Sequence, residues 1–219
     1  ARSERERAEV LAGISHDLRT PLARLRLEAE MSVADEAARD AIGADIEQMD
    51  AIIGQFLDYA RAAGDESPTA VDVCNLLNDV AARFARSGVS LQLVVEDSPP
   101  LPPMALRPLA SARAIGNLIE NARKYGGGEI TLTAQLDGET LVIQVMDRGP
   151  GIPPAEVERM KRPFTRLEAA RTDTKGTGLG LAIVERIARL HNGTLTLSAR
   201  EGGGLIAALR FPRLPPSGS

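Results

Sequence analysis

Two long stretches at the start of the chain carry apolar residues at intervals of three and four. The first, from Arg2 to about Met31, and the second, up to Arg61, are separated by a polar break at residues 32–36. The apolar positions are Leu11, Ile14, Leu18, Leu22 and Leu25 in the first stretch, and Ile42, Ile46, Met49, Ile53, Phe56 and Ala60 in the second. This spacing predicts two amphipathic helices that form a hairpin.

Helices of this length cannot bury their apolar stripes in one another alone. We therefore expect two hairpins to pair into a four-helix bundle, which makes the protein a homodimer. Pro21 removes a backbone donor and crowds the carbonyl of Asp17, so a kink is expected in the first helix.

A polar segment with Gly and Pro, residues 63–68, reads as a linker. Beyond it, helical and strand patterns mix. Strands are predicted at 71–73, 90–96, 129–136 and 140–147, helices at 75–86, 111–125 and 179–190, and a closing hairpin at 194–211. The predicted fold class is α+β, with a helical-hairpin domain at residues 1–64 followed by an α/β-sandwich domain at residues 68–219.

Composition supports two soluble domains and argues against nucleic acid as a direct partner. The 219 residues are 43% hydrophobic, and residues 1–66 hold 8 Arg against 15 Asp and Glu, which makes the hairpin acidic. The single cysteine, Cys74, fits a reducing compartment, and neither a signal peptide nor an apolar run of roughly 18 residues is present. We expect a cytoplasmic piece of an inner-membrane receptor, attached to the membrane only through segments outside this sequence.

The run Ser15-His16-Asp17-Leu18-Arg19-Thr20-Pro21-Leu22 sets one of only two histidines beside a carboxylate within the first helix. A histidine with a pKa near 6.5 is mostly neutral at pH 7, and its free lone pair makes His16 a candidate phosphoryl acceptor. Thr20 lies one turn later on the same face. The other histidine, His191, ends a predicted helix, where a cation would complement the helix dipole, so we expect it to cap that helix.

A candidate nucleotide site follows about a hundred residues later. Asn117 and Asn121 lie four apart on one helix face, and amide oxygens suit a Mg²⁺ ion that also binds phosphate. Asp147 ends an apolar strand, where a carboxylate can accept from an exocyclic amine, and Gly149 and Gly151 follow it. Taken singly, these residues also fit a polar helix face and a turn.

The run Gly176-Thr177-Gly178-Leu179-Gly180 opens a predicted helix whose N-terminus favours phosphate. It matches neither a P-loop nor a dinucleotide fingerprint, because no Gly-Lys-Ser/Thr follows it and no strand precedes it. The segment 152–175 before it carries six basic residues and reads as a lid whose cations face the phosphates, or else as a solvated loop.

Together these residues resemble the H, N, G1, F and G2 boxes of sensor histidine kinases, of the EnvZ type. The matching segments are His16-Asp17-Leu18-Arg19-Thr20-Pro21, Asn117 to Tyr125, Asp147-Arg148-Gly149-Pro150-Gly151, Pro163-Phe164 and Gly176 to Leu181. The resemblance implies a Bergerat-type ATP-binding fold. It also implies that His16 takes the γ-phosphoryl group of Mg-ATP and passes it to an aspartate of a response regulator, which we expect to be OmpR-type.

The resemblance also assigns roles to individual residues. It places Asn121 on Mg²⁺, Asp147 on adenine and Tyr125 near the base, makes Asp17 polarise His16, and has Thr20 position a water that dephosphorylates the regulator. The catalytic candidates are His16, Asp17, Thr20 and Arg171. The candidates for binding ATP are Asn117, Asn121, Lys124, Tyr125, Asp147, Gly149, Gly151, Phe164, Gly176, Thr177, Gly178, Leu179 and Gly180.

Two other classes of protein remain open at this point. Related ATPases carry a glutamate base four residues before the metal-binding Asn, where this chain has Asn117, and Glu120 points about 100° away from Asn121. An ATPase or chaperone is therefore disfavoured, whereas a non-catalytic ATP-binding scaffold is opposed only by the intact motifs. The stimulus, the kinase-to-phosphatase balance and phosphorylation within or across the dimer are not determined, although the EnvZ resemblance favours transfer across.

Overall fold

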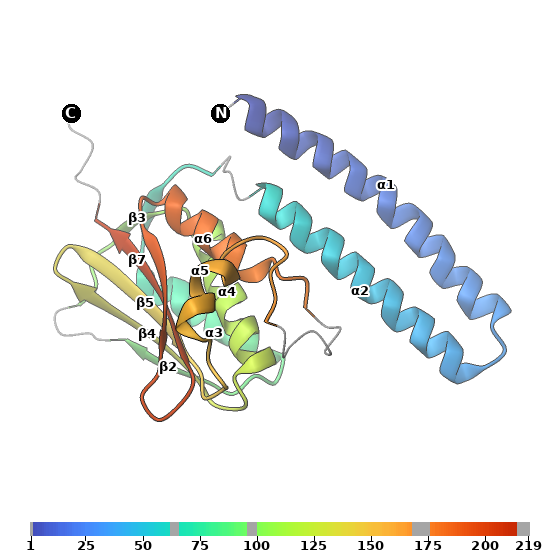
Figure 1. Ribbon diagram of the computed structural model, residues 1–219. Helices are drawn as coiled ribbons and strands as arrows, with labels where there is room; N and C mark the ends of the chain where they lie inside the picture. Colours follow the sequence, from blue (N-terminus) through green and yellow to red (C-terminus); the bar gives the residue numbers. More distant parts are fainter. Residues whose placement is uncertain (1, 62–65, 96–99, 168–175, 214–219) are drawn as a thin grey trace.

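The computed structural model describes residues 2–61, 66–95, 100–167 and 176–213, without the side chains of residues 2–16 and 58–61. Helices α1 (Arg2–Ser32) and α2 (Glu36–Arg61) form the predicted hairpin (Figure 1). Asp35, just before α2, caps this helix, because its carboxylate accepts from Ala37 N at 3.1 Å. Helix α1 continues through Pro21. The helical hairpin is therefore confirmed, with its turn where the polar break predicted it.

Ion pairs record the antiparallel register of the two helices. Arg19 Nε lies 2.7 Å from Asp50, and Arg26 Nη1 lies 3.2 Å from Glu47. All four side chains are at least half exposed, so these ion pairs show how the two helices are aligned but add little to the stability of the hairpin.

The remainder of the described chain is an α/β sandwich, as predicted. Its main sheet has the strand order β2-β4-β5-β7-β6, in which only the β2–β4 pair is parallel, and β1 and β3 form a small second sheet. The strands are β1 (Thr69–Val71), β2 (Leu91–Val95), β3 (Met104–Leu106), β4 (Ile130–Asp137), β5 (Thr140–Met146), β6 (Thr194–Ala199) and β7 (Leu205–Pro212). The helices are α3 (Val73–Arg86), α4 (Pro108–Tyr125), the short η1 (Pro154–Glu156) and α5 (Val157–Met160), and α6 (Gly180–Leu190).

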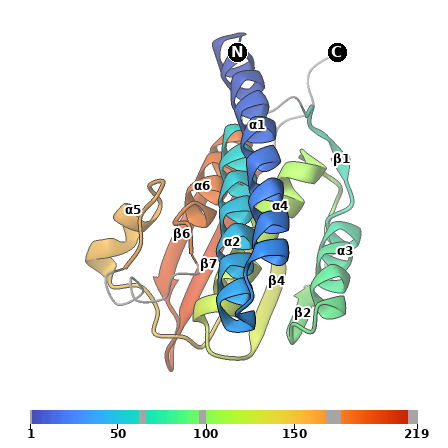
Figure 2. The ribbon, with the colours of Figure 1, turned by 90° about the vertical axis from the view of Figure 1, so that its right-hand side faces the viewer.

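Helices α3, α4 and α6 cover one face of the main sheet, and the hairpin lies over α4 and α6 on the side away from the sheet, with α3 to one side of it (Figures 1 and 2). The core between sheet and helices is apolar and fully buried, with Phe211, Leu77, Ile115, Ile119, Leu132, Ile143 and Ile187 among its members. Helix α2 contacts α6, and Phe56 of α2 packs against this core. The hairpin is thus seated on the helical layer of the sandwich.

Several elements differ from the sequence prediction. Strand β1 lies two residues earlier than expected, β3 was not predicted, and α4 begins at Pro108, which occupies the first helical turn. Strand β3 is only three residues long and follows two prolines, so it has too few positions to show an alternating pattern. In addition, η1 and α5 occupy part of the segment that was read as a long loop.

His191 is the C-cap residue of α6, as its position predicted, but it is buried and neutral and does not act as a cation. It is buried against Phe211, where its Nε2 accepts from Arg107 N at 2.9 Å and its Nδ1 lies 2.8 Å from Ile187 O. Only the neutral ring with hydrogen on Nδ1 satisfies both partners. Burial lowers the pKa of His191, so the ring joins α6 to α4 as a neutral group.

Glu66 and Arg107 connect the beginning of the sandwich to the start of α4 and the end of α6, close to His191. The Glu66 carboxylate accepts from Leu109 N at 2.8 Å and from Ala110 N at 2.9 Å, which caps α4. Arg107 donates to the carbonyls of Glu66 and Leu190.

Among the described residues, no helix combines the length and apolarity needed to cross a membrane.

Candidate functional site

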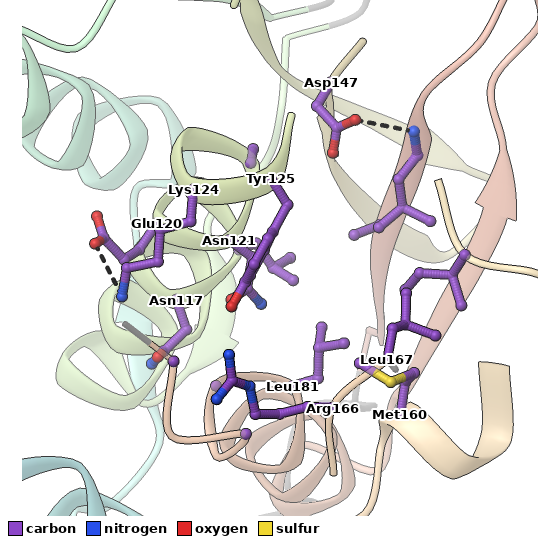
Figure 3. A pocket seen from close by; sticks show the side chains of 18 of the residues that line it. Asn117, Glu120, Asn121, Lys124, Tyr125, Asp147, Met160, Arg166, Leu167 and Leu181 are labelled. Carbon is purple, nitrogen blue, oxygen red and sulfur yellow. Dashed lines mark hydrogen bonds and ion pairs between the residues drawn. The ribbon is translucent and has the colours of Figure 1, made fainter. Parts of the chain in front are cut away.

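A cavity of about 410 Å³ opens between α4, the start of α6 and the ends of the central strands (Figure 3). Its volume suits a nucleotide-sized ligand. The predicted binding residues that line it are Asn117, Asn121, Lys124, Tyr125, Asp147, Gly151, Gly176, Thr177, Gly178 and Gly180. Residues from three separate stretches of sequence are thus brought to one place.

Helix α4 supplies one wall, because positions four apart share a face. Asn117 Nδ2 donates to the Arg113 carbonyl at 3.0 Å, which leaves its amide oxygen for other partners. A Cβ at Gly180 would lie 3.2 Å from Asn121 Oδ1 and 3.5 Å from Asn117 Oδ1. Both amides therefore face the first turn of α6, where the backbone N–H groups have no partner within the helix.

Asp147 lies just beyond the end of β5 and is 7% exposed. Its Oδ1 accepts from Gly149 N at 2.9 Å and from Leu205 N at 3.1 Å. These bonds hold the carboxylate in one orientation, in which the group faces the cavity (Figure 3). An ionised carboxylate fixed in this way can accept a further hydrogen bond from a ligand through Oδ2.

The glycine run packs against residues far away in the sequence. A Cβ at Gly176 would lie 2.5 Å from the Tyr125 hydroxyl, so the tyrosine reaches across to the run. Gly178 has φ +72°, and a Cβ there would lie 2.7 Å from Thr165 O and 2.8 Å from Thr165 N. Only glycine fits this position, because the backbone has a positive φ and because the segment around Thr165 passes too close for a side chain.

Thr177 joins the glycine run to the hairpin. Its hydroxyl donates to Gln55 Oε1 on α2 in a short hydrogen bond, and it accepts from Leu179 N at 3.3 Å. Gln55 also lines the cavity. The site is therefore composed of residues from both the sandwich and the hairpin.

Three predicted binding residues lie outside the lining. Leu179 is fully buried in the core, and Phe164 is 63% exposed with a positive φ. Gly149 acts on the site through its N–H bond to Asp147.

Within residues 152–167, the described part of the segment before the glycine run, fewer cations face the cavity than the composition predicted. Arg159 pairs with Glu156, and Lys161 Nζ lies 2.7 Å from Glu158, whereas Arg166 lines the cavity. The paired cations are neutralised by acidic neighbours three residues earlier on the same turn. Arg171 lies outside the described residues.

Glu120 also lines the cavity, but its environment makes it a weak base. A side-chain hydrogen bond from Arg123 lowers the pKa of Glu120, and Lys124 Nζ lies 3.3 Å away. Its carboxylate oxygens accept two hydrogen bonds from Arg123, from Nε to Oε2 at 2.9 Å and from Nη2 to Oε1 at 2.7 Å. This agrees with the expectation that Glu120 does not replace the missing glutamate base at position 117.

The phosphoryl-acceptor candidates lie on α1, away from the lining of the cavity. Asp17 and Thr20 are exposed on this helix, and the side chain of His16 is outside the described part of the structure. Arg19 pairs with Asp50, and its Nη2 would lie 3.7 Å from a Cβ at Gly54. Because α1 and α2 are antiparallel, the backbone of His16, one turn before Arg19, is level with the α2 turn that contains Gln55.

Sequence reasoning missed part of the lining. Ile152, Met160, Leu181, Leu205 and Ala207 provide apolar surface, and Gln55 provides a polar group from the hairpin. The apolar residues are indistinguishable from ordinary core residues by pattern. No signal in the sequence pointed to Gln55, because its contact depends on how the hairpin is seated.

A helical hairpin seated on an α/β sandwich, with a cavity between an Asn-bearing helix and a glycine-led helix, is the arrangement expected of a nucleotide-binding protein with an attached helical domain. Two families match the chain. Residues 107–215 match the family described as histidine kinase-, DNA gyrase B- and HSP90-like ATPase, and residues 6–64 match the His Kinase A (phospho-acceptor) domain.

Known proteins support the same class. The sensor histidine kinase GtrS of Pseudomonas aeruginosa is 36% identical over 210 residues, which cover 95% of this chain and 42% of GtrS. The structure of full-length ShkA in complex with AMPPNP is 27% identical, with a TM-score of 0.73. The match covers 96% of this chain and 47% of the ShkA chain. The histidine kinase domain of the Escherichia coli osmosensor EnvZ is 34% identical, with a TM-score of 0.54, and the match covers 71% of this chain and 96% of that domain.

The chain belongs to the sensor histidine kinases of two-component systems and is EnvZ-like. It spans about half the length of the curated relatives it matches.

Proposed function

We propose that this chain is the kinase core that transfers the γ-phosphoryl group of Mg-ATP to His16 and then to an aspartate of a response-regulator receiver domain. One observation carries the proposal. The cavity that unites the Asn pair, Asp147 and the glycine run lies against α2, in the turn that is level with His16. The candidate ATP site and the acceptor helix thus belong to one chain, and the EnvZ resemblance favours transfer across the dimer, between two such chains.

Asp147 and Tyr125 would hold the adenine end of ATP. Asp147 Oδ1 is occupied by two backbone donors, so the exocyclic amine of adenine would donate to Oδ2. The Tyr125 side chain reaches from the end of α4 to the glycine run, where its ring can pack beside the base. The apolar lining would cover the rest of the ring.

The phosphates would lie at the first turn of α6, close to the glycine run, Lys124 and Arg166. In the described part of the chain, no cluster of His, Cys, Asp and Glu is arranged to hold a metal ion. The donor that fits Mg²⁺ is the Asn121 amide oxygen beside Gly180, because this ion binds few protein groups and shares phosphate oxygens. When bound, Mg²⁺ would supply positive charge that offsets the phosphate charge.

In the transfer step, the unprotonated nitrogen of His16 attacks the γ-phosphorus, and the bond from that phosphorus to the β,γ-bridging oxygen breaks. ADP leaves, and the proton on the other ring nitrogen passes toward Asp17. Arg171 would face the phosphates as part of the lid. Because Asn117 cannot accept a proton and Arg123 holds Glu120 ionised, hydrolysis of ATP by water would be slow.

A second copy of the chain would complete the hairpin. Several large apolar side chains of α1 and α2 are exposed, namely Leu18, Leu25, Leu27, Met31, Ile42, Met49 and Ile52. Pairing of two hairpins into a four-helix bundle would bury them, which supports the homodimer. The receiver domain, which we expect to be OmpR-type, would then dock near His16, and Thr20 would position the water that dephosphorylates it.

The test is incubation with γ-labelled ATP and Mg²⁺, followed by treatment of the labelled protein with acid and with alkali. We expect an acid-labile, alkali-stable label that disappears in His16→Ala, while nucleotide binding is retained in that variant and lost in Asn121→Ala. A labelled His16→Ala protein would refute the acceptor assignment. ATP binding without any label would favour a scaffold, and release of free phosphate without label would favour an ATPase.

A further inference from the structure

Gln55 is the residue by which the hairpin reaches the nucleotide cavity. It lies on α2, it lines the cavity, and its Oε1 accepts the hydroxyl proton of Thr177 in the glycine run. Phe56, the next residue, packs against the core of the sandwich, so this turn of α2 is held in place.

The hydroxyl proton of Thr177 is already committed in this arrangement. A threonine hydroxyl has one proton to donate, and here that proton goes to Gln55 while the oxygen accepts from Leu179 N. A nucleotide phosphate at the start of α6 is also an acceptor and would compete for the same proton. A charged phosphate oxygen is the stronger acceptor of the two.

We propose that Gln55 is a positioning residue that holds the glycine run against α2 through Thr177, and that a phosphate group of the nucleotide displaces it by taking the Thr177 proton. Binding of a phosphorylated nucleotide then loosens the hairpin from the glycine run in the turn level with His16. This inference rests on the proposed function, because it takes the nucleotide to bind in the same cavity.

The competition predicts a ligand-dependent effect of Gln55→Ala. The neutral hydrogen bond that must be broken opposes phosphate binding, so its removal should tighten AMPPNP binding by about two- to tenfold in the presence of Mg²⁺. Adenosine has no phosphate and should bind the variant as it binds the unchanged chain. Gln55→Glu keeps acceptor oxygens near Thr177 but adds negative charge, so it should weaken AMPPNP binding and leave adenosine unaffected.

Isothermal titration calorimetry of the full chain, with AMPPNP and with adenosine in the presence of Mg²⁺, measures both affinities and tests this proposal. Gln48→Ala, the same change two turns earlier on α2 and outside the cavity lining, is the matched control and should alter neither affinity. Unchanged or weaker AMPPNP binding by Gln55→Ala would overturn the proposal. Equal tightening of both ligands would also overturn it, because Gln55 would then only obstruct the cavity.

The two levels of proposal fail differently. If the unchanged chain does not bind AMPPNP, the proposed function and the Gln55 role fall together. Alternatively, the unchanged chain binds AMPPNP and, in the separate test with γ-labelled ATP, becomes labelled on His16. If Gln55→Ala then binds AMPPNP as Gln48→Ala does, only the role of Gln55 is refuted.

Discussion

Asp147 combines a structural and a binding role, and two substitutions separate them. Its Oδ1 accepts from the backbone N–H groups of Gly149 and Leu205, at 2.9 and 3.1 Å, in a site that is 7% exposed. Asp147→Ala leaves both donors without this acceptor, at a cost of about 1–3 kcal/mol each. The free energy of unfolding should therefore fall by about 2–6 kcal/mol, which corresponds to a thermal midpoint lower by about 5–20 °C.

Asp147→Asn should behave differently, because its amide oxygen can still accept from both backbone groups. We expect most of the stability to remain. The group that replaces Oδ2 is then an NH₂, which presents a donor where the adenine amine also donates. ATP binding should weaken by about 10- to 100-fold, the worth of a charge-assisted hydrogen bond.

Differential scanning calorimetry and titration with AMPPNP measure the two effects for each variant. Equal destabilisation by both substitutions would show that the backbone donors do not depend on this oxygen. Unchanged nucleotide affinity in Asp147→Asn would remove the residue from recognition of the base.

Three further predictions address other parts of the molecule. A Cβ at Gly204 would lie 2.0 Å from Asp147 O, whereas one at Gly203 meets nothing within 4 Å, although both residues have positive φ. Gly204→Ala should therefore unfold at a lower temperature than Gly203→Ala, by an overpacking cost of about 1–3 kcal/mol, and equal midpoints would refute the close approach. Because burial lowers the pKa of His191, the unfolded chain takes up this proton at higher pH than the folded chain. The unfolding free energy should be steady above about pH 6.5 and fall below it, and denaturant titrations across this range should show a flatter profile in His191→Gln. Thr20→Ala should keep autophosphorylation and lose dephosphorylation of a labelled receiver domain, and the reverse pattern would refute its assigned role.

The helices and most strands were predictable because their signals are local. The three-and-four spacing of apolar residues on α1 and α2 reflects burial of one helix face, and the Asp35 region interrupts it where the chain turns. The spacing of Asn117 and Asn121 likewise places both amides on one face before any packing is known. Strand β3 was missed because three residues carry no measurable period.

The state of His191 shows where local reasoning fails. Its position at a helix end predicted a cation, because the dipole term is visible in the sequence. Burial beside Phe211 and the donor at Arg107 N are contributed by distant segments, and together they favour the neutral ring. Desolvation of a charge outweighs a helix-end dipole when the group is buried.

The sequence by itself determined the helical hairpin, the sandwich and the residue types at the candidate site, since each depends on spacings of a few residues. Only the tertiary structure decided which cations face the cavity, which oxygen of Asp147 remains for a ligand, and that Gln55 of the hairpin reaches Thr177. The physical reason is that hydrogen bonds and ion pairs form between atoms within a few ångströms, and residues 122 positions apart in the chain come that close only after two layers have packed.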